Sequence, residues 1–183
     1  MKISRALDDT LMIAVQTNNL ARTYHQMKDY DTARTLLKQS IAAATAIDAD
    51  RWLGVFQSEL GQTLVALGRH NEAETLFRAA LERAQANEDQ ETVVKTQARL
   101  AKLLARSGEL GEAETLAAQA EARARRMRYQ RGVADATAAR ADIAQARGKI
   151  DSARTLYAEA RRLYTILHDP TAQQLAEGTP ESA

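Results

Sequence analysis

A repeat with a period of 40 residues constrains the fold of this chain more than any other feature. Leu20, Leu60 and Leu100 share one position of the repeat, and Arg140 takes that position in the fourth copy. The same offset relates Ala33, Ala73, Ala113 and Ala153, then Leu36, Leu76, Leu116 and Leu156, and the glycines Gly68, Gly108 and Gly148. A repeat of this length predicts structural units that bury their apolar faces only by stacking on one another.

Within each copy the apolar residues follow the spacing of α-helices. In the first copy Ala33, Leu37, Ile41 and Ala44 recur every three or four residues, which places them on one helix face. The turns "MKDYD", "LGRHN", "SGELG" and "RGKID" separate two such segments in each copy, and the glycines of the last three suit a helix end. The spacing therefore predicts helices over residues 10–27, 30–48, 51–67, 70–88, 91–107, 110–128, 131–147 and 150–168.

These helices pair into an all-α array of four antiparallel helical hairpins. We expect a single array over residues 1–170, with repeats at 10–50, 51–90, 91–130 and 131–170. Residues 171–183 should form a short cap or a disordered tail. The segment "ISRALDD" at 3–9 aligns with 163–169, so we interpret it as the end of a preceding second helix.

Composition argues against several classes of function. The net charge of +1 gives no overall field for nucleic acid or an acidic membrane, and no apolar run approaches the length of a membrane span. The chain has no cysteine and no signal peptide, so we expect a cytoplasmic protein. The three histidines stand in no ligand spacing and no catalytic motif is present, so we expect neither metal, cofactor nor enzyme activity.

The repeat resembles the tetratricopeptide repeat. The second copy carries the pattern as Leu60-Gly61, then Leu64, then Ala73 and Phe77. The departures are the long period and the tryptophan position, which is held by Thr17, Gln57, Gln97 and Thr137. This long form is similar to arrays in large bacterial regulators and in kinesin light chains. The resemblance implies a right-handed solenoid that binds proteins or peptides.

The resemblance also implies a concave groove lined by the first helix of each repeat. The candidate peptide-binding residues on that face are Asn18, Arg22, Gln62, Lys95, Arg99 and Lys102. Lys95 and Arg99 take two positions that hold a peptide's C-terminal carboxylates in chaperone-binding relatives, which suggests a partner with an acidic C-terminus. Glu59, where those relatives have Asn, would repel a carboxylate.

Four cations share one face of the third first helix, because Lys95, Arg99, Lys102 and Arg106 are spaced by whole helical turns. Two interpretations remain open for this stripe. It is either a solvated face balanced by Glu59, Asp135 or Asp142 on neighbouring helices, or a site for an acidic peptide.

Three functions fit these observations. The first is a protein- or peptide-binding scaffold or adaptor, and the second is a ligand-sensing repeat segment of a larger bacterial regulator. The third is a self-assembling array, because Leu156, Tyr157, Leu163, Tyr164 and Leu167 at the C-terminal end would be partly bare; it predicts homo-oligomers through the terminal helices. The arginine-rich "ARARRMRYQR" at 122–131 lies at a second-helix end, where cations suit the helix dipole, so we do not assign it to nucleic acid.

Overall fold

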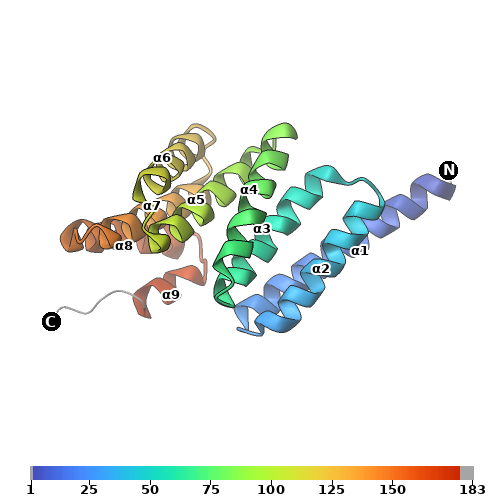
Figure 1. Ribbon diagram of the computed structural model, residues 1–183, viewed down its shortest axis with the longest axis horizontal. Coiled ribbons are helices and arrows are strands. Elements are labelled where there is room, and N and C mark those ends of the chain that lie inside the picture. Colours follow the sequence, from blue (N-terminus) through green and yellow to red (C-terminus); the bar gives the residue numbers. More distant parts are fainter. Residues whose placement is uncertain (1, 178–183) are drawn as a thin grey trace. The chain divides into compact units, whose positions relative to one another are not determined.

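The computed structural model describes residues 2–177, and these residues form helices and no strand, as Figure 1 shows. The all-α prediction is therefore confirmed. The helices are α1 (Lys2–Gln26), α2 (Tyr30–Ala46), α3 (Asp50–Ala66), α4 (His70–Ala86), α5 (Gln90–Ser107), α6 (Leu110–Arg126), α7 (Gln130–Ala146), α8 (Ile150–Ile166) and α9 (Thr171–Glu177). From α2 to α8, each helix begins within one residue of its predicted start and ends within two residues of its predicted end.

The prediction for residues 3–9 was wrong. These residues do not form a separate helix end but continue directly into α1, which begins at Lys2. Later copies break the chain at the position of Asp8 with a left-handed residue, for example Asp48 at φ 51° and Glu88 at φ 55°. The absence of Gly and Pro from residues 2–9 does not explain the difference, since residues 42–49 and 82–89 lack them too and still end in a turn.

Every turn inside a hairpin has one residue in the left-handed region. Gly68, Gly108 and Gly148 take it at φ 71–89°, and Lys28 takes it in the first copy at φ 63°. Glycine adopts this conformation without strain, whereas Lys28 has a Cβ that disfavours it. The recurring glycine of the sequence is therefore explained by the helix end.

The chain divides into two compact units, and the first comprises residues 1–92. Here α1 packs on α2, α2 on α3, and α3 on α4, while the first helices α1 and α3 also touch. Phe56 and Phe77 fill the core and are fully buried. Gly61 allows the close approach of α3 and α4, since a Cβ built there would lie 2.7 Å from Cε1 of Phe77.

The second unit comprises residues 93–183, and in it α6 packs on α7, α7 on α8, and α8 on α9. Its core is built largely from alanine: Val94 and Ala98 of α5 meet Ala120 and Ala124 of α6 and Val133 and Ala136 of α7. Inside this unit, Gln97 Nε2 also donates a hydrogen bond of 2.8 Å to Gln119 Oε1. Small side chains let these helices lie close together, which fixes the side chains of α5 and α7 relative to each other.

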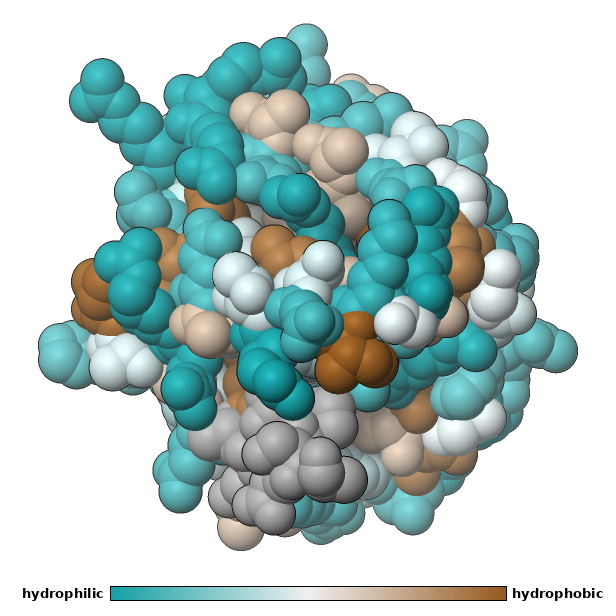
Figure 2. Space-filling model, turned by 90° about the vertical axis from the view of Figure 1, so that its left-hand side faces the viewer, coloured by the Kyte–Doolittle hydropathy of each residue, from teal (hydrophilic) through white to brown (hydrophobic). Residues whose placement is uncertain are grey.

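The C-terminal end is more covered than the sequence suggested. Tyr157 and Tyr164 are buried, at 8% and 1% exposure, because Leu175 of α9 packs against both of their clusters. Leu167 remains exposed, as expected. Figure 2, which faces the α8 side of Figure 1, shows a mainly hydrophilic surface with single hydrophobic residues between.

Candidate functional site

The candidate residues of the first unit lie on neighbouring first helices. Asn18 and Arg22 lie on α1 and Gln62 lies on α3, and a 3.1 Å contact joins His25 Nδ1 of α1 to Thr63 Oγ1 of α3. Arg22 is exposed and Gln62 is half-buried. Asn18 is buried, and its Oδ1 has no hydrogen-bond partner among the described residues. A buried acceptor without a donor costs free energy, and this oxygen has almost no exposed surface through which a group outside the chain could reach it.

The candidate residues of the second unit are all on α5. Lys95, Arg99 and Lys102 are half-buried, and Arg106, one turn further, is exposed. Lys95 Nζ lies 5.7 Å from the ring centre of Tyr129 in a cation–π contact. The helical stripe of cations predicted from the sequence is therefore present on one helix, with each cation accessible to solvent in part or in full.

Asp135 and Asp142 of α7 each accept a hydrogen bond from a tyrosine of α8. The Tyr164 hydroxyl donates to Asp135 Oδ1 at 2.6 Å, and Arg131 Nε lies 3.4 Å from the same oxygen. Asp142 accepts a hydrogen bond from the hydroxyl of Tyr157. Both carboxylates are held by tyrosines of α8, because each hydroxyl is buried and needs a partner.

A polar network closes the end of the second unit. Asp169 accepts hydrogen bonds from Arg131 and from the backbone and hydroxyl of Thr171, the last two at 2.9 and 2.5 Å. The guanidinium of Arg131 lies 5.5 Å from the ring centre of Tyr164. Burial by itself would raise the pKa of Asp169, but the hydrogen bonds from Thr171 and the charge of Arg131 outweigh it and hold this pKa below its usual value. The network ties the start of α9 to α7.

The lowered pKa of Asp169 predicts how the stability of this unit responds to acid. A carboxyl whose pKa is lower in the folded than in the unfolded chain stabilises the fold above the unfolded pKa of about 3.9. This contribution is lost as pH falls through the folded pKa. We expect Asp169→Asn to be less stable than the wild type at pH 7 and to lose less further stability between pH 5 and 2.

Urea unfolding followed by circular dichroism at several pH values measures this difference. Asp151→Asn is the matched control, because Asp151 is fully exposed on α8 and only loosely paired with Arg154. Parallel acid profiles for Asp169→Asn and the wild type would show that the network does not stabilise the folded unit.

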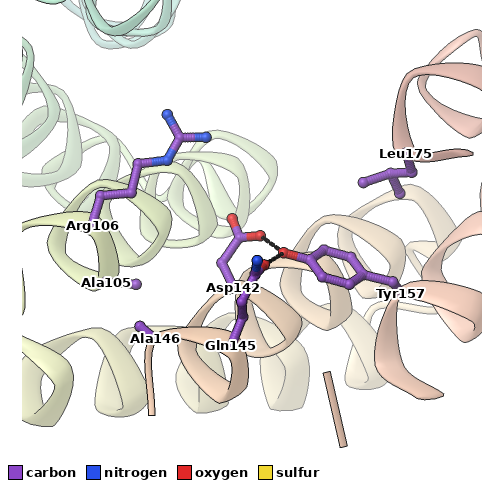
Figure 3. Close-up of a pocket in the computed structure, with 7 residues that line it drawn as sticks. All are labelled: Ala105, Arg106, Asp142, Gln145, Ala146, Tyr157 and Leu175. Carbon is purple, nitrogen blue, oxygen red and sulfur yellow. Dashed lines mark hydrogen bonds between the residues drawn. The ribbon is translucent and has the colours of Figure 1, made fainter. Parts of the chain in front are cut away.

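A pocket of about 510 Å³ opens in the second unit (Figure 3). The first helices α5, α7 and α9 form most of its wall, and α8 contributes one tyrosine to it. The lining residues are Ala105, Arg106, Asp142, Gln145, Ala146, Tyr157 and Leu175. Figure 3 shows Arg106 and Leu175 on opposite sides, with Asp142, Gln145 and the Tyr157 hydroxyl between them.

The hydroxyl of Tyr157 is the centre of the pocket's polar chemistry. It contacts Asp142 Oδ1 and, at 2.8 Å, Gln145 Oε1. Burial raises the pKa of Tyr157, and the hydrogen bond and charge of Asp142 raise it further, so the hydroxyl stays protonated and acts as a donor. The pocket thus combines a cation, a carboxylate, a neutral donor and an apolar wall.

The sequence placed Arg106 in the cationic stripe of α5 and Asp142 on a neighbouring helix, but did not predict this pocket. Tyr157 shares its repeat position with Leu37, Phe77 and Ala117. The fourth copy is therefore the one in which this position carries a polar group. Tyr164 likewise stands where the other copies have alanine. These two exceptions to the repeat were the signal available in the sequence.

The described residues give no sign of a metal centre or a membrane span. No group of three or more His, Asp or Glu among them could hold a metal ion. Each helix in this part of the chain is too short or too polar to cross a lipid bilayer.

Comparison with solved structures finds several helical repeat proteins of similar fold. Aspartyl phosphate phosphatase F from Bacillus subtilis matches 89% of this chain at 16% identity and a TM-score of 0.72, and the chain spans 43% of that protein's length. BtubC (BKLC) from P. vanneervenii matches 96% of this chain at 16% sequence identity and a TM-score of 0.66. The match covers 80% of the BtubC chain. A putative kinesin light chain from Podosopora anserina with TPR-like repeats matches 88% of this chain at 21% sequence identity and a TM-score of 0.64. The match covers 90% of that protein's chain.

The family comparison agrees with these structures. A search of curated proteins finds no match. The tetratricopeptide repeat matches residues 10–86, 52–126 and 134–159, and so most of the array. The chain therefore belongs to the tetratricopeptide repeat family.

Proposed function

We propose that this protein is a scaffold or adaptor that binds an acidic protein segment or peptide along the first helices of its repeats. Membership of a family of protein-interaction repeats supports this class of function. The cysteine-free composition supports a cytoplasmic location, and the long repeat supports a bacterial source. In this proposal residues 1–170 act as a single array, and residues 171–183 supply its cap and tail.

The cationic face of α5 is the observation that carries the proposal. Lys95, Arg99, Lys102 and Arg106 are spaced by whole turns, and like charges at this spacing destabilise an isolated helix. Carboxylates of a partner would offset that repulsion through charge-assisted hydrogen bonds. Since the four cations are all at least partly exposed, an extended acidic segment can reach each of them.

The first unit has polar side chains of its own on first helices. Arg22 of α1 is exposed and Gln62 of α3 is half-buried. Such side chains can bond the backbone of a bound peptide, independently of its sequence.

Fluorescence anisotropy with labelled acidic peptides tests the proposal. The probe is a pool of peptides that carry Asp and Glu at the C-terminal positions, and the reference is the same pool with Asn, Gln and an amidated end. We expect the wild type to prefer the acidic pool, and the Lys95→Glu/Arg99→Glu variant to bind it at least roughly tenfold more weakly.

The matched control is Arg154→Glu/Arg161→Glu, which changes the net charge equally on exposed residues of the second helix α8. This control should keep the wild-type affinity to within about twofold. Equal losses of affinity in the two variants would show that the peptides respond only to the net charge of the protein. Unchanged affinity in the α5 variant would refute the site.

Self-association through α1 is a second candidate, favoured by the exposure of Ile13 and Leu20. These residues are 61% and 48% exposed, whereas their equivalents Leu53 and Leu60 on α3 are 7% and 5% exposed. A second copy of this chain could cover the bare face in the way that α2 covers α3. Light scattering should then give a mass that rises with concentration in the wild type and stays monomeric in Ile13→Lys/Leu20→Lys.

A further inference from the structure

The pocket of the second unit presents a cation that is open to an incoming anion. Arg106 is exposed at one side of the pocket and forms no ion pair within the part of the chain that the structure describes. Its guanidinium carries five N–H donors in a planar fork, and this geometry matches a carboxylate. An anionic group of a ligand therefore has a defined place in the pocket.

The floor of the same pocket has more acceptors than donors. Tyr157 has a single proton, and its hydroxyl contacts both Asp142 Oδ1 and Gln145 Oε1. If the proton goes to one of these oxygens, the other lacks a donor, and the second oxygen of Asp142 is also free to accept. A ligand group with several N–H donors would supply what this floor lacks, and an ammonium has three such donors and no acceptor.

The third feature is an apolar wall. Leu175 of α9 lies opposite Arg106, and the methyl groups of Ala105 and Ala146 complete the lining. The volume of about 510 Å³ lies within the range of small-molecule sites. An apolar side chain placed against Leu175 would be removed from water.

We propose that this pocket binds a small zwitterion with an apolar side chain, the chemistry that free amino acids and dipeptides share. The carboxylate pairs with Arg106, the ammonium with Asp142 and Gln145, and the side chain packs on Leu175. The negative charge of Asp142 would repel a ligand that is only an anion, and the positive charge of Arg106 would repel a ligand that is only a cation. A neutral apolar ligand would leave the surplus acceptors unsatisfied.

Isothermal titration calorimetry on the full chain tests the pocket with defined probes. The probes are leucine, alanyl-leucine, N-acetylleucine, which lacks the ammonium, and leucinamide, which lacks the carboxylate. We expect leucine, alanyl-leucine or both to bind. The acetylated and the amidated form of each binding probe should bind roughly tenfold more weakly or worse. Tighter binding of leucine would indicate a free amino acid as the ligand, and tighter binding of alanyl-leucine would indicate a dipeptide.

Two variants assign the ligand's ends to residues. Arg106→Gln should abolish the preference for a free carboxylate, so that the zwitterion and its amide bind alike. Asp142→Asn should abolish the preference for a free ammonium. Arg126→Gln, an exposed arginine of α6, is the control and should keep both preferences. Thermal melts of each variant confirm that the fold is intact.

Two outcomes would overturn the inference. The first is no binding of leucine or alanyl-leucine at about 10 mM. The second is equal binding of the zwitterion and both blocked forms, which would indicate only apolar contact. Neither outcome touches the acidic-peptide site, since that site is probed separately with Lys95→Glu/Arg99→Glu.

Discussion

Truncating Tyr164 to alanine should lower the free energy of unfolding by about 3–5 kcal/mol, whereas Tyr164→Phe should lower it by about 1–2 kcal/mol. The aromatic ring fills the centre of a cluster with Ala134, Ala138 and Ala160 and is 1% exposed. The small neighbouring side chains cannot fill the cavity that Tyr164→Ala leaves. The variant therefore loses both the burial of the ring and the packing contacts around it, which lowers the free energy of unfolding. Tyr164→Phe keeps the ring and removes only the hydrogen bond to Asp135.

Urea unfolding measures both values, and the difference between them separates the ring from its hydroxyl. Burial raises the pKa of the Tyr164 hydroxyl, and the negative charge of Asp135 raises it further, so the hydroxyl is protonated and donates at neutral pH. Tyr24→Phe, at a half-buried position of α1, serves as the control and should be nearly neutral. If Tyr164→Phe cost as much as Tyr164→Ala, the stability of this end would depend on the polar network rather than on packing.

Phe77→Ala should cost about 3–5 kcal/mol, and the effect of a change at Gly61 should reverse sign in its presence. In the wild type a Cβ at position 61 would lie 2.7 and 2.8 Å from two carbons of the Phe77 ring. Gly61→Ala therefore overpacks the α3–α4 contact and should cost about 1–3 kcal/mol. In Phe77→Ala the same methyl group enters empty space and replaces a helical glycine, so it should stabilise.

The double-mutant cycle built from these four proteins gives the coupling between the two positions. Gly111→Ala on α6 is the control, because a Cβ there meets nothing within 4 Å. This control should be neutral or slightly stabilising. Additive losses at positions 61 and 77 would contradict the close contact of α3 and α4 on which the geometry of the first unit rests.

The helices were predictable because the repeat presents the same evidence in each copy. The bounds of α2 to α8 follow from apolar spacing and from a turn that recurs every 40 residues. At the N-terminal end the prediction was wrong, because residues 3–9 were aligned with the end of a second helix but continue into α1. At the C-terminal end the expected short cap forms as α9, but its packing was not predicted. The continuation of α1 through Asp8 and the packing of Leu175 over Tyr157 are set by local backbone and tertiary contacts rather than by the repeat pattern.

The candidate site was predictable to the extent that one helix determines it. The shared face of Lys95, Arg99 and Lys102 follows from helix geometry alone. The partners of Asp135 and Asp142 did not follow, because the tyrosines that bind them are 29 and 15 residues away in sequence. Arg131 and Asp169, which are 38 residues apart, have a counterpart in Arg51 and Asp89 at 3.7 Å, so the repeat does place some distant pairs.

Mapping a bound acidic peptide by backbone NMR would test the central claim most directly. The isotope-labelled full chain is titrated with the tightest peptide of the acidic pool, and the amide shifts are assigned to helices. The account predicts the largest changes on the first helices, centred on α5 between Lys95 and Arg106. Changes confined to the second helices α2, α4, α6 and α8, with α5 unaffected, would contradict it.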